Sequence, residues 1–404
     1  MDGMRDQSLS LIRRGYDFTR WLRDDDPGPV TTRLMGRPAT VIEGVEAARF
    51  FYSEPTLSRK GAAPPIPAMT LFGAGAIHST DDDEHRHRKG QFVDLLDDTA
   101  AFEIARRAGA EWDRRVVELG YVPDVFSMSC EVLFTAVRDW AGVSDEAIGV
   151  RRGTTQMVSM IDGFGSAGRR QLRAVKGRLG AQRWARAEIK RARKSGETET
   201  PLGQVAAWTG PDGRPLPLSV AAVELLNVLR PTVAVAWFVA ATAESFVEWP
   251  EYRFAVKVRS VDPKAYAHEL RRYYPFVPVL AAKPRTATSF EGHEVPAGGR
   301  FVIDIWQHLN DPKIWIDPEN FRPERFNDRL VGQYDLIPQG GGDKNTGHRC
   351  PGEDVAIELI EVFAIRLAEF DAIEGQGPSM RGNHSRMPPR PYRASLRLAP
   401  TAAE

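Results

Sequence analysis

The sequence predicts a mainly α-helical protein with a small β region. Apolar residues recur at helical spacing through long stretches, and over residues 99–145 this spacing places Trp112, Val116 and Leu119 on one face. A second long stretch, Leu218–Phe246, is largely apolar and carries few charges. Segments with the composition of strands are short by comparison. These patterns favour a helical body that carries a minor sheet.

The chain has 404 residues, of which 42% are hydrophobic and 27% charged, so it can bury a large core. Its 54 Lys and Arg residues balance 54 Asp and Glu residues, so no net charge draws it to nucleic acid or to an anionic membrane. Two cysteines, Cys130 and Cys350, are too few for a disulfide framework and suit a reducing compartment. These features predict a cytoplasmic protein that does not bind nucleic acid.

The N-terminal sequence lacks the apolar core of a signal peptide or a membrane anchor. Within the central apolar stretch, only Pro231–Ala243 is both long and uncharged, and thirteen residues are too few to cross a bilayer comfortably. We therefore expect a buried core helix here and no membrane span.

The elements of the first half follow from turn residues and periodicity. An extended segment over Pro38–Glu43 precedes a helix over Val45–Tyr52. The proline content of Gly61–Pro67 predicts a loop, and the acidic first turn of the segment that begins at Asp83 predicts the start of a helix. Residues 99–145 then form helical core scaffold.

The second half begins with a basic segment, residues 169–194, which has apolar residues at helical spacing and predicts a helix with a solvated charged face. Residues 195–217 are rich in Gly, Pro, Thr and Ser and predict a surface loop. Leu218–Phe246 predicts the long central helix, which Pro231 should kink because it removes one backbone hydrogen bond. The predicted strands of a small antiparallel sheet are Thr286–Phe290 and Phe301–Ile305.

Residues 339–353 form a glycine-rich loop that exposes Cys350 and runs into a helix. Four glycines allow the loop to fold tightly around a bulky group, and Pro351 suits the first position of the helix. A thiol at a helix N-terminus beside His348 and Arg349 should have a lowered pKa, and the thiolate is the form that binds a metal. The alternative is a buried cysteine with a structural role. The glycines are Gly340, Gly341, Gly342 and Gly347.

Two upstream motifs precede this cysteine loop. Glu269-Leu-Arg-Arg272 lies in a helical stretch, and Phe321-Arg-Pro-Glu-Arg-Phe326 follows about fifty residues on. Together with Cys350, this order resembles the cytochrome P-450 superfamily of haem-thiolate proteins. The resemblance implies a cytochrome P-450 fold, one catalytic domain over residues 1–404, and haem b whose iron is bound by the Cys350 thiolate.

The central helix lacks a motif that ordinary members of the superfamily carry. They use an acidic residue followed by an alcohol to deliver protons to bound oxygen, whereas the corresponding residues here are Leu229-Arg-Pro-Thr-Val233. The Arg230-Pro231 pair, the cysteine loop and the His85–Lys89 cluster resemble the fatty-acid peroxygenase branch, which uses hydrogen peroxide without a reductase. Asp343, where the superfamily usually has Phe, agrees with this branch. The resemblance implies oxidation at the α and β carbons, giving hydroxy acids and some terminal alkene by decarboxylation.

Arg230 lies among aliphatic residues, where a guanidinium needs an anionic partner unless it snorkels to the surface. The resemblance implies that this partner is the carboxylate of a long- or medium-chain fatty acid, which brings the missing base into the site beside Pro231. It also implies that His78 lies near the carboxyl group, as in branch members that decarboxylate. The other roles given by resemblance are Phe72 and Phe276 in the acyl channel, and Arg59, His85, Lys89 and His348 at the haem propionates.

Two other functions stay open on these grounds. One is a P-450 monooxygenase that depends on a reductase, and the other is a haem-binding sensor without chemistry. The chain has no room for an appended flavin domain and no cysteine set for an iron–sulfur cluster, and the branch resemblance implies no obligatory redox partner. His78, a lone histidine in a flexible loop, is also compatible with a surface role.

Overall fold

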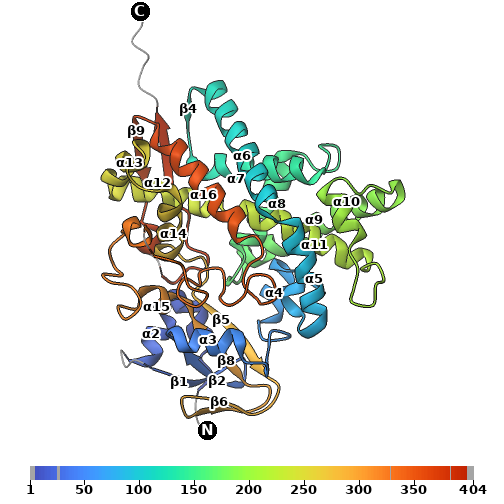
Figure 1. Cartoon of the computed structure of the whole chain (residues 1–404), viewed down its shortest axis with the longest axis vertical. Helices are drawn as coiled ribbons and strands as arrows, with labels where there is room; N and C mark the ends of the chain where they lie inside the picture. Colours follow the sequence, from blue (N-terminus) through green and yellow to red (C-terminus); the bar gives the residue numbers. More distant parts are fainter. Residues whose placement is uncertain (1–4, 25–27, 328, 383, 398–404) are drawn as a thin grey trace, which may run out of the picture.

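The computed structural model describes residues 5–24, 28–327, 329–382 and 384–397, and it is mainly helical, as the sequence predicts. Figure 1 shows the N-terminal strands at one end and a larger helical body above them. The helices are α1 (Ser8–Arg14), α2 (Phe18–Arg23), α3 (Val45–Ser53), α4 (Pro65–Leu71), α5 (Asp82–Leu95), α6 (Asp98–Leu119), α7 (Val125–Ala141), α8 (Val150–Asp162), α9 (Arg169–Ser195), α10 (Pro201–Ala207), α11 (Leu218–Ala234), α12 (Ala236–Glu248), α13 (Pro250–Lys257), α14 (Pro263–Tyr273), α15 (Ile305–Asn310) and α16 (Glu353–Ala368). The 3-10 turns are η1 (Gly15–Asp17), η2 (Ile77–Ser79), η3 (Pro323–Phe326) and η4 (Met380–Gly382). The strands are β1 (Val30–Leu34), β2 (Arg37–Ile42), β3 (Leu57–Ser58), β4 (Tyr121–Val122), β5 (Val279–Pro284), β6 (Thr288–Phe290), β7 (His293–Val295), β8 (Arg300–Asp304), β9 (Ala372–Gln376) and β10 (Arg393–Arg397).

The main sheet has the strand order β1-β2-β8-β5-β3 among the described residues. Strands β2 and β8 run parallel, with Val41 opposite Val302, and the other neighbours in this sheet are antiparallel. Helix α3 packs on the sheet through a buried cluster that includes Phe51 and Phe301. Because β3 is the edge strand of this sheet, the sheet fixes the position of Arg59, which follows β3 directly.

The predicted pairing of residues 286–290 with residues 301–305 is wrong. Strand β6 pairs with β7 instead, with Phe290 opposite His293, and β8 lies between β2 and β5 in the main sheet. The chain does reverse at Glu291 and Gly292, where the sequence predicted a turn. A hairpin turn is a local feature, whereas the partners of β8 are distant in the sequence, which is why only the turn was predicted.

The long central helix is interrupted at Val235, so that α12 follows α11 directly. Pro231 lies inside α11, and Val235, one turn later, donates its N–H to Thr232 at 3.2 Å instead of to residue 231. A proline ring crowds the preceding turn and weakens the regular hydrogen bonds around it. The interruption lies at Val235, one turn after the proline at which the sequence predicted the kink.

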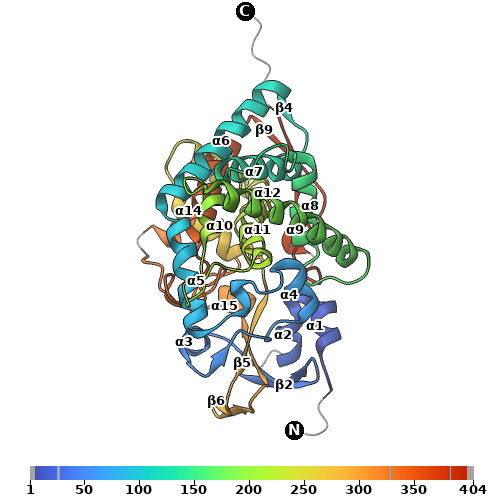
Figure 2. The same cartoon turned by 90° about the vertical axis from the view of Figure 1, so that its right-hand side faces the viewer.

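Helices α11 and α12 together span Leu218–Glu248, the one stretch among the described residues that is long and apolar enough to cross a membrane. In its most apolar window, however, 72% of the residues are buried inside the protein. Figure 2 shows the two helices running through the middle of the helical body, with α4 and α5 between that body and the sheet. The stretch is therefore a core helix, as the sequence predicts.

Two segments predicted as loops contain helices. Helix α4 begins at Pro65, inside the proline-rich segment 61–67, and α10 begins at Pro201, inside segment 195–217. Proline is well suited to the first helical position because its fixed φ matches the helix and its missing N–H has no partner there anyway. Pro65 and Pro201 are therefore helix starts, whereas the rest of segment 195–217 after Ala207 has no helix before α11.

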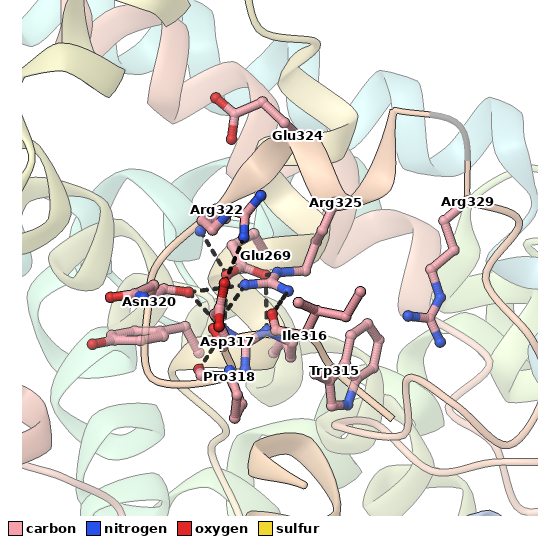
Figure 3. Close-up of polar contacts among 12 residues, drawn as sticks. Glu269, Trp315, Ile316, Asp317, Pro318, Asn320, Arg322, Glu324, Arg325 and Arg329 are labelled. Carbon is pink, nitrogen blue, oxygen red and sulfur yellow. Dashed lines mark hydrogen bonds and ion pairs between the residues drawn. The ribbon is translucent and has the colours of Figure 1, made fainter. Parts of the chain in front are cut away.

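Glu269 ties α14 to the segment that precedes the cysteine loop (Figure 3). Its buried carboxylate accepts two N–H groups of Arg272, both at 2.8 Å. Arg325 forms an ion pair with it at 3.0 Å, and the backbone N–H of Arg322 donates to it at 2.8 Å. The two upstream motifs of the sequence thus meet in one buried charge cluster.

Candidate active site

The loop before Cys350 is held by backbone hydrogen bonds. The N–H of Cys350 donates to the carbonyl of Gln339 at 2.9 Å, and the N–H of Gly342 donates to that of Gln333 at 2.9 Å. Gly340 and Gly342 have φ angles of 94° and 83°, in the left-handed region that residues with a Cβ rarely adopt. The turn of the loop therefore depends on these two glycines.

The other two glycines of the loop are needed for space. A Cβ on Gly341 would lie 2.9 Å from side-chain atoms of Ile337 and Tyr52. A Cβ on Gly347 would lie 2.7 Å from the carbonyl oxygen of Asp343. The tight fold predicted from four glycines is present, and it divides their roles between backbone conformation and close packing.

Asp343 closes the exposed tip of the loop. One carboxylate oxygen accepts the backbone N–H groups of Asn345 at 2.9 Å and Thr346 at 2.8 Å, and also the Thr346 hydroxyl at 2.9 Å. These hydrogen bonds, that of the hydroxyl first, lower the pKa of Asp343. A short carboxylate at this position therefore stabilises a local turn.

Helix α16 begins at Glu353 and not at Pro351, where the sequence predicted its first residue. Glu353 accepts a hydrogen bond from Nε of Arg349 at 2.5 Å and forms an ion pair with Arg271 of α14. Burial alone would raise the pKa of Glu353, but these guanidinium groups outweigh burial and lower it to about 2. The loop is thus anchored to α14 by charge.

The pKa of the Cys350 thiol departs from the sequence prediction. Cys350 is partly accessible, but protein atoms surround its sulfur, and burial raises its pKa while Lys89 lowers it only in part. The predicted lowering by the helix N-terminus is therefore wrong, because the desolvation of a thiolate is the larger effect. A bound metal ion deprotonates a coordinating thiol outright, so this direction is compatible with ligation.

The residues expected at the propionates gather around the cysteine loop. The ring of His85 on α5 lies tilted against that of His348, with 3.9 Å between the ring centroids. Lys89, one turn further along α5, donates a hydrogen bond to the carbonyl of Arg349. Arg59 lies close enough that, together with burial, its charge lowers the pKa of both histidines. Three segments distant in the sequence thus bring four basic side chains together.

Neither Arg59 nor Lys89 of this group forms an ion pair with a carboxylate among the described residues, although Asp81 acts on Arg59 and Asp343 and Glu353 act on Lys89 at longer range. Burial lowers the pKa of Arg59 to about 10 and that of Lys89 to about 8. Nη1 of Arg59 is buried and has no hydrogen-bond partner in the described part of the chain. Desolvation, together with the charge of Arg59, lowers the pKa of His348 to about 2. A haem, with two propionates and an iron for Cys350, fits this donor set.

Arg230 lies on α11, just before Pro231, with 6% of its surface exposed. Its Nη2 donates to the side-chain oxygen of Asn227 at 3.3 Å, and its Nε is buried without a hydrogen-bond partner among the described residues. Burial and the charge of Arg178 lower the pKa of Arg230 to about 9. The guanidinium is therefore positioned for an anion that its surroundings do not supply.

Two of the predicted substrate residues lie beside Arg230. The rings of Phe72 and His78 stack with 4.1 Å between their centroids, and Cζ of Arg230 is 5.8 Å from the Phe72 centroid. Desolvation and the charge of Arg230 lower the pKa of His78 to about 3, so the imidazole is neutral. Phe276 packs edge-on against Trp237 of α12, with 5.8 Å between centroids, and has no described contact with the other three.

Arg178 is a polar residue of this region that sequence reasoning missed. The sequence predicted a solvated charged face for α9, but Arg178 is 4% exposed and donates to the carbonyls of Leu71 and Phe72. Ala174 and Ala181, on the same face of α9, are small and fully buried. That row of small residues was the available signal that this face packs inward.

A buried network behind Arg230 was also missed. It consists of Arg88, Glu224 and Asn227, which are linked by an ion pair and a hydrogen bond. Glu224, Asn227 and Arg230 are spaced three residues apart, so neighbouring members meet on one helix. The spacing was visible in the sequence, but the part played by Arg88 depends on tertiary structure.

Solved structures match nearly the whole chain. Cytochrome P450EX alpha (CYP152N1) with myristic acid is 31% identical, with a TM-score of 0.90 over 98% of this chain and 97% of its own. The ligand-free OleT cytochrome P-450 is 29% identical, with a TM-score of 0.92 over 100% and 99% of the two chains. Cytochrome P450SP alpha (CYP152B1) with (R)-ibuprophen is 31% identical, with a TM-score of 0.88 over 97% and 98%.

Curated proteins match a shorter part. Tabersonine 16-hydroxylase 2 of Catharanthus roseus is 35% identical over 114 residues, and carnosic acid synthase of Rosmarinus officinalis is 36% identical over 115 residues. These matches cover 27% and 26% of this chain, which spans only 22% of the length of each relative.

A family model described as "Cytochrome P450" matches residues 264–394, which contain both the Glu269 motif and the Cys350 loop. The identity to P450EX alpha extends this match, because it reaches 31% across nearly all of both chains. The protein therefore belongs to the cytochrome P-450 superfamily and is a haem-thiolate oxidoreductase, and it is similar over nearly its full length to the CYP152 proteins P450EX alpha and P450SP alpha.

Proposed function

We propose that this protein oxidises fatty acids at their α and β carbons with hydrogen peroxide, in the cytoplasm and without an obligatory redox partner. The observation that carries the proposal is the buried guanidinium of Arg230, which bonds to an amide but to no carboxylate among the described residues. A fatty-acid carboxylate can accept two of its N–H groups at once, the geometry that arginine favours.

Similar proteins support the substrate class. The P450EX alpha structure holds myristic acid, and a variant of OleT was crystallised with arachidonic acid. These proteins are 31% and 29% identical to this chain over almost its full length. A long- or medium-chain fatty acid is therefore the substrate that we propose.

The cofactor that we propose is haem b. Cys350 would hold its iron, and Arg59, His85, Lys89 and His348 would hold its propionates. When bound, the haem supplies the oxidising chemistry, and hydrogen peroxide supplies the oxygen.

The residues of the chain would bind the substrate and direct its proton. Arg230 would hold the carboxylate so that only the neighbouring carbons reach the iron. Thr232, the alcohol of this stretch, donates its hydroxyl to the carbonyl of Val228 at 3.2 Å and is therefore occupied. The carboxylate of the substrate would act as the base, and general acid–base help of this kind contributes about 10²–10⁴-fold.

His78 would contact the carboxylate that Arg230 holds. Because burial lowers the pKa of His78 to about 3, the ring is neutral and can donate one N–H without adding a second positive charge. Such a contact would hold the carboxylate in place and thereby disfavour hydroxylation relative to decarboxylation. We therefore propose α- and β-hydroxy acids together with some terminal alkene from oxidative decarboxylation.

The test is to incubate the purified haem-containing protein with a long-chain fatty acid and hydrogen peroxide and to identify products by mass spectrometry. The matched control is the primary alcohol of the same length, which lacks the carboxylate and should not react. Turnover with NADPH and a reductase, but not with peroxide, would identify a monooxygenase. A spectral response to fatty acid without product in either assay would identify a sensor.

A further inference from the structure

A buried carboxylate connects the two residues that would hold the carboxyl group of the substrate. Glu224 lies on α11, six residues before Arg230, and its side chain has no exposed surface. Its Oε1 accepts the backbone N–H of Ile77 at 2.8 Å, and its Oε2 accepts a side-chain N–H of Asn227 at 2.8 Å. Arg88 of α5 forms an ion pair with the same carboxylate. One side chain thus joins α5, α11 and the turn η2.

The first end of this network fixes the turn that carries His78. Ile77 is the first residue of η2, and the N–H at the start of a helical turn has no partner within the turn. Glu224 supplies that partner. Arg88 adds a second contact, because its guanidinium donates to the carbonyl of Gly75 at 2.8 Å. The position of His78 is therefore set by α5 and α11.

The second end of the network reaches Arg230. Asn227 gives an N–H to Glu224, which leaves its side-chain oxygen to accept from Arg230 at 3.3 Å. Glu224, Asn227 and Arg230 form a chain of contacts that extends about 9 Å along α11, at a rise of about 1.5 Å per residue. The imidazole of His78 and the guanidinium of Arg230 are thus positioned by one connected set of contacts.

The ion pair between Arg88 and Glu224 is a costly way to fill this space. Taking two charges out of water is unfavourable, and apolar residues of the same volume often give equal or greater stability. Apolar residues could not, however, accept the N–H groups of Ile77 and Asn227 at defined positions. Only a carboxylate can accept both N–H groups here and so fix the positions of Ile77 and Asn227.

We propose that Glu224 is a positioning residue that sets His78 against Arg230 and thereby the ratio of terminal alkene to hydroxy acid. This inference rests on the proposed function. With the network intact, the carboxylate held by Arg230 meets the imidazole. With the network broken, η2 is free to shift relative to α11, and Arg230 alone restrains the carboxylate. Products then shift toward hydroxy acids while the fatty acid still binds.

The variant Glu224→Gln tests this with little change in volume. Glutamine keeps one acceptor oxygen, but its NH₂ group faces at least one of the three donors, so a contact is lost. We expect normal haem content, fatty-acid affinity within about threefold of the parent, and an alkene-to-hydroxy-acid ratio lower by roughly threefold or more.

The matched control is Glu244→Gln. Glu244 is also a buried glutamate, on α12, and it accepts the backbone N–H of Met380 at 3.0 Å without a described contact to the site. Its product ratio should equal that of the parent. The comparison separates the loss of a buried carboxyl group from the loss of this particular network.

A double variant separates positioning from general damage. If Glu224 acts through His78, adding Glu224→Gln to His78→Gln lowers the ratio no further. An unchanged ratio in Glu224→Gln, an effect additive with His78→Gln, or a parent that forms hydroxy acid without alkene overturns the proposal. A parent that forms no product with peroxide overturns the proposed function itself. If Glu224→Gln does not fold, Arg88→Lys replaces it with the same expectation, because lysine lacks the planar fork that reaches Glu224 and Gly75 together.

Discussion

The two cysteines show how far the surroundings of a residue decide its chemistry. Burial raises the pKa of both, but Cys130 is buried in α7 with no described basic group acting on it, whereas Cys350 is partly accessible and Lys89 offsets part of the rise. We predict that Cys350→Ser loses the thiolate-type spectrum of the ferrous carbon monoxide complex. Cys130→Ser, the matched control, should keep it. Retention of that spectrum by Cys350→Ser would exclude the residue as the iron ligand.

Arg230 should be indispensable for fatty acids because its guanidinium is buried and no carboxylate pairs with it in the described part of the chain. We predict that Arg230→Ala nearly eliminates peroxide-driven oxidation, since truncating one partner of a buried charge pair costs about 2–5 kcal/mol. Steady-state kinetics measure the loss, with the exposed Arg173→Ala on α9 as the control. In the parent protein, a short carboxylic acid should allow oxidation of a substrate that lacks its own carboxylate. Normal turnover by Arg230→Ala would contradict the substrate-assisted mechanism.

His78 should influence the products without changing its charge. Burial and Arg230 lower its pKa to about 3, so the imidazole is neutral at every ordinary assay pH. We predict that the alkene-to-hydroxy-acid ratio is flat between about pH 5 and about pH 8 and that His78→Gln lowers it throughout. Product analysis across that range measures both. A ratio that follows a protonation near pH 6.5 would mean that the ring titrates like a solvent-exposed histidine.

The sequence could predict residues that act through a motif but not those that act through tertiary contacts. Cys350 and Arg230 stand in short patterns whose chemistry is visible in a single sequence. Arg88 and Glu224 belong to the same region, but they are 136 residues apart and meet only in the folded chain. The expected lowering of the Cys350 pKa was wrong for a related reason, because burial is a property of the whole fold.

Among the elements, α14 contacts residues 316–325 through Glu269 (Figure 3). The side chain of Arg325 is 8% exposed and pairs with Glu269, which is fully buried. It also donates to the carbonyls of Ile316 at 2.6 Å and Asn320 at 3.0 Å. We predict that Arg325→Ala costs about 3 kcal/mol of unfolding free energy, the lower end for a broken buried pair, since Arg272 still balances Glu269.

Arg322 provides the matched control for that variant. Its side chain is 47% exposed and pairs with Asp317, which is 58% exposed, at 3.0 Å. Exposed pairs contribute about 0–1 kcal/mol, and Arg322→Ala keeps the backbone N–H that donates to Glu269. Urea unfolding should therefore separate the two variants clearly. Equal losses would mean that the buried cluster contributes no more than a surface pair.

The long helices α6, α7, α9 and α11 followed from the sequence because helical periodicity is local. The main sheet did not, since its parallel pair joins Val41 to Val302 and no local pattern records such a partner. Helices α4 and α10 were read as loops because proline marks both turns and helix starts. Element type was thus predictable where one segment decides it, and strand pairing was not.

At the scale of the whole molecule, the numbers of acidic and basic residues are equal, but burial shifts the pKa values of individual groups. The chain has 54 of each. Burial nevertheless lowers the pKa of Arg59 to about 10 and of Arg230 to about 9, and it raises the pKa of both Glu244 and Glu361 to about 7. Buried groups of either sign resist ionisation, so the stability of the molecule depends on pH.

Glu244 makes this dependence measurable because it is only 3% exposed. Burial raises its pKa from 4.5 to about 7, against the hydrogen bonds from Ser379 and Met380 that lower it. Between those two values the native state keeps a proton that the unfolded chain releases, so each unit rise in pH lowers the free energy of unfolding by up to about 1.4 kcal/mol. Glu248 raises the pKa of Glu244 and Arg381 lowers it. Glu244 in turn adds to the rise that burial causes in the pKa of Tyr274 and Tyr392.

We predict that Glu244→Gln, which keeps an acceptor oxygen but cannot ionise, removes this part of the pH dependence. Relative to the parent, the variant should gain stability as pH rises from about 4.5 to about 7 and hold a constant advantage above that. Urea unfolding at matched pH values measures the difference, in which the other titrating groups cancel. Glu46→Gln, at a side chain 72% exposed on α3, should give a profile parallel to the parent. A parallel profile for Glu244→Gln as well would mean that the buried carboxyl titrates no differently from one in the unfolded chain.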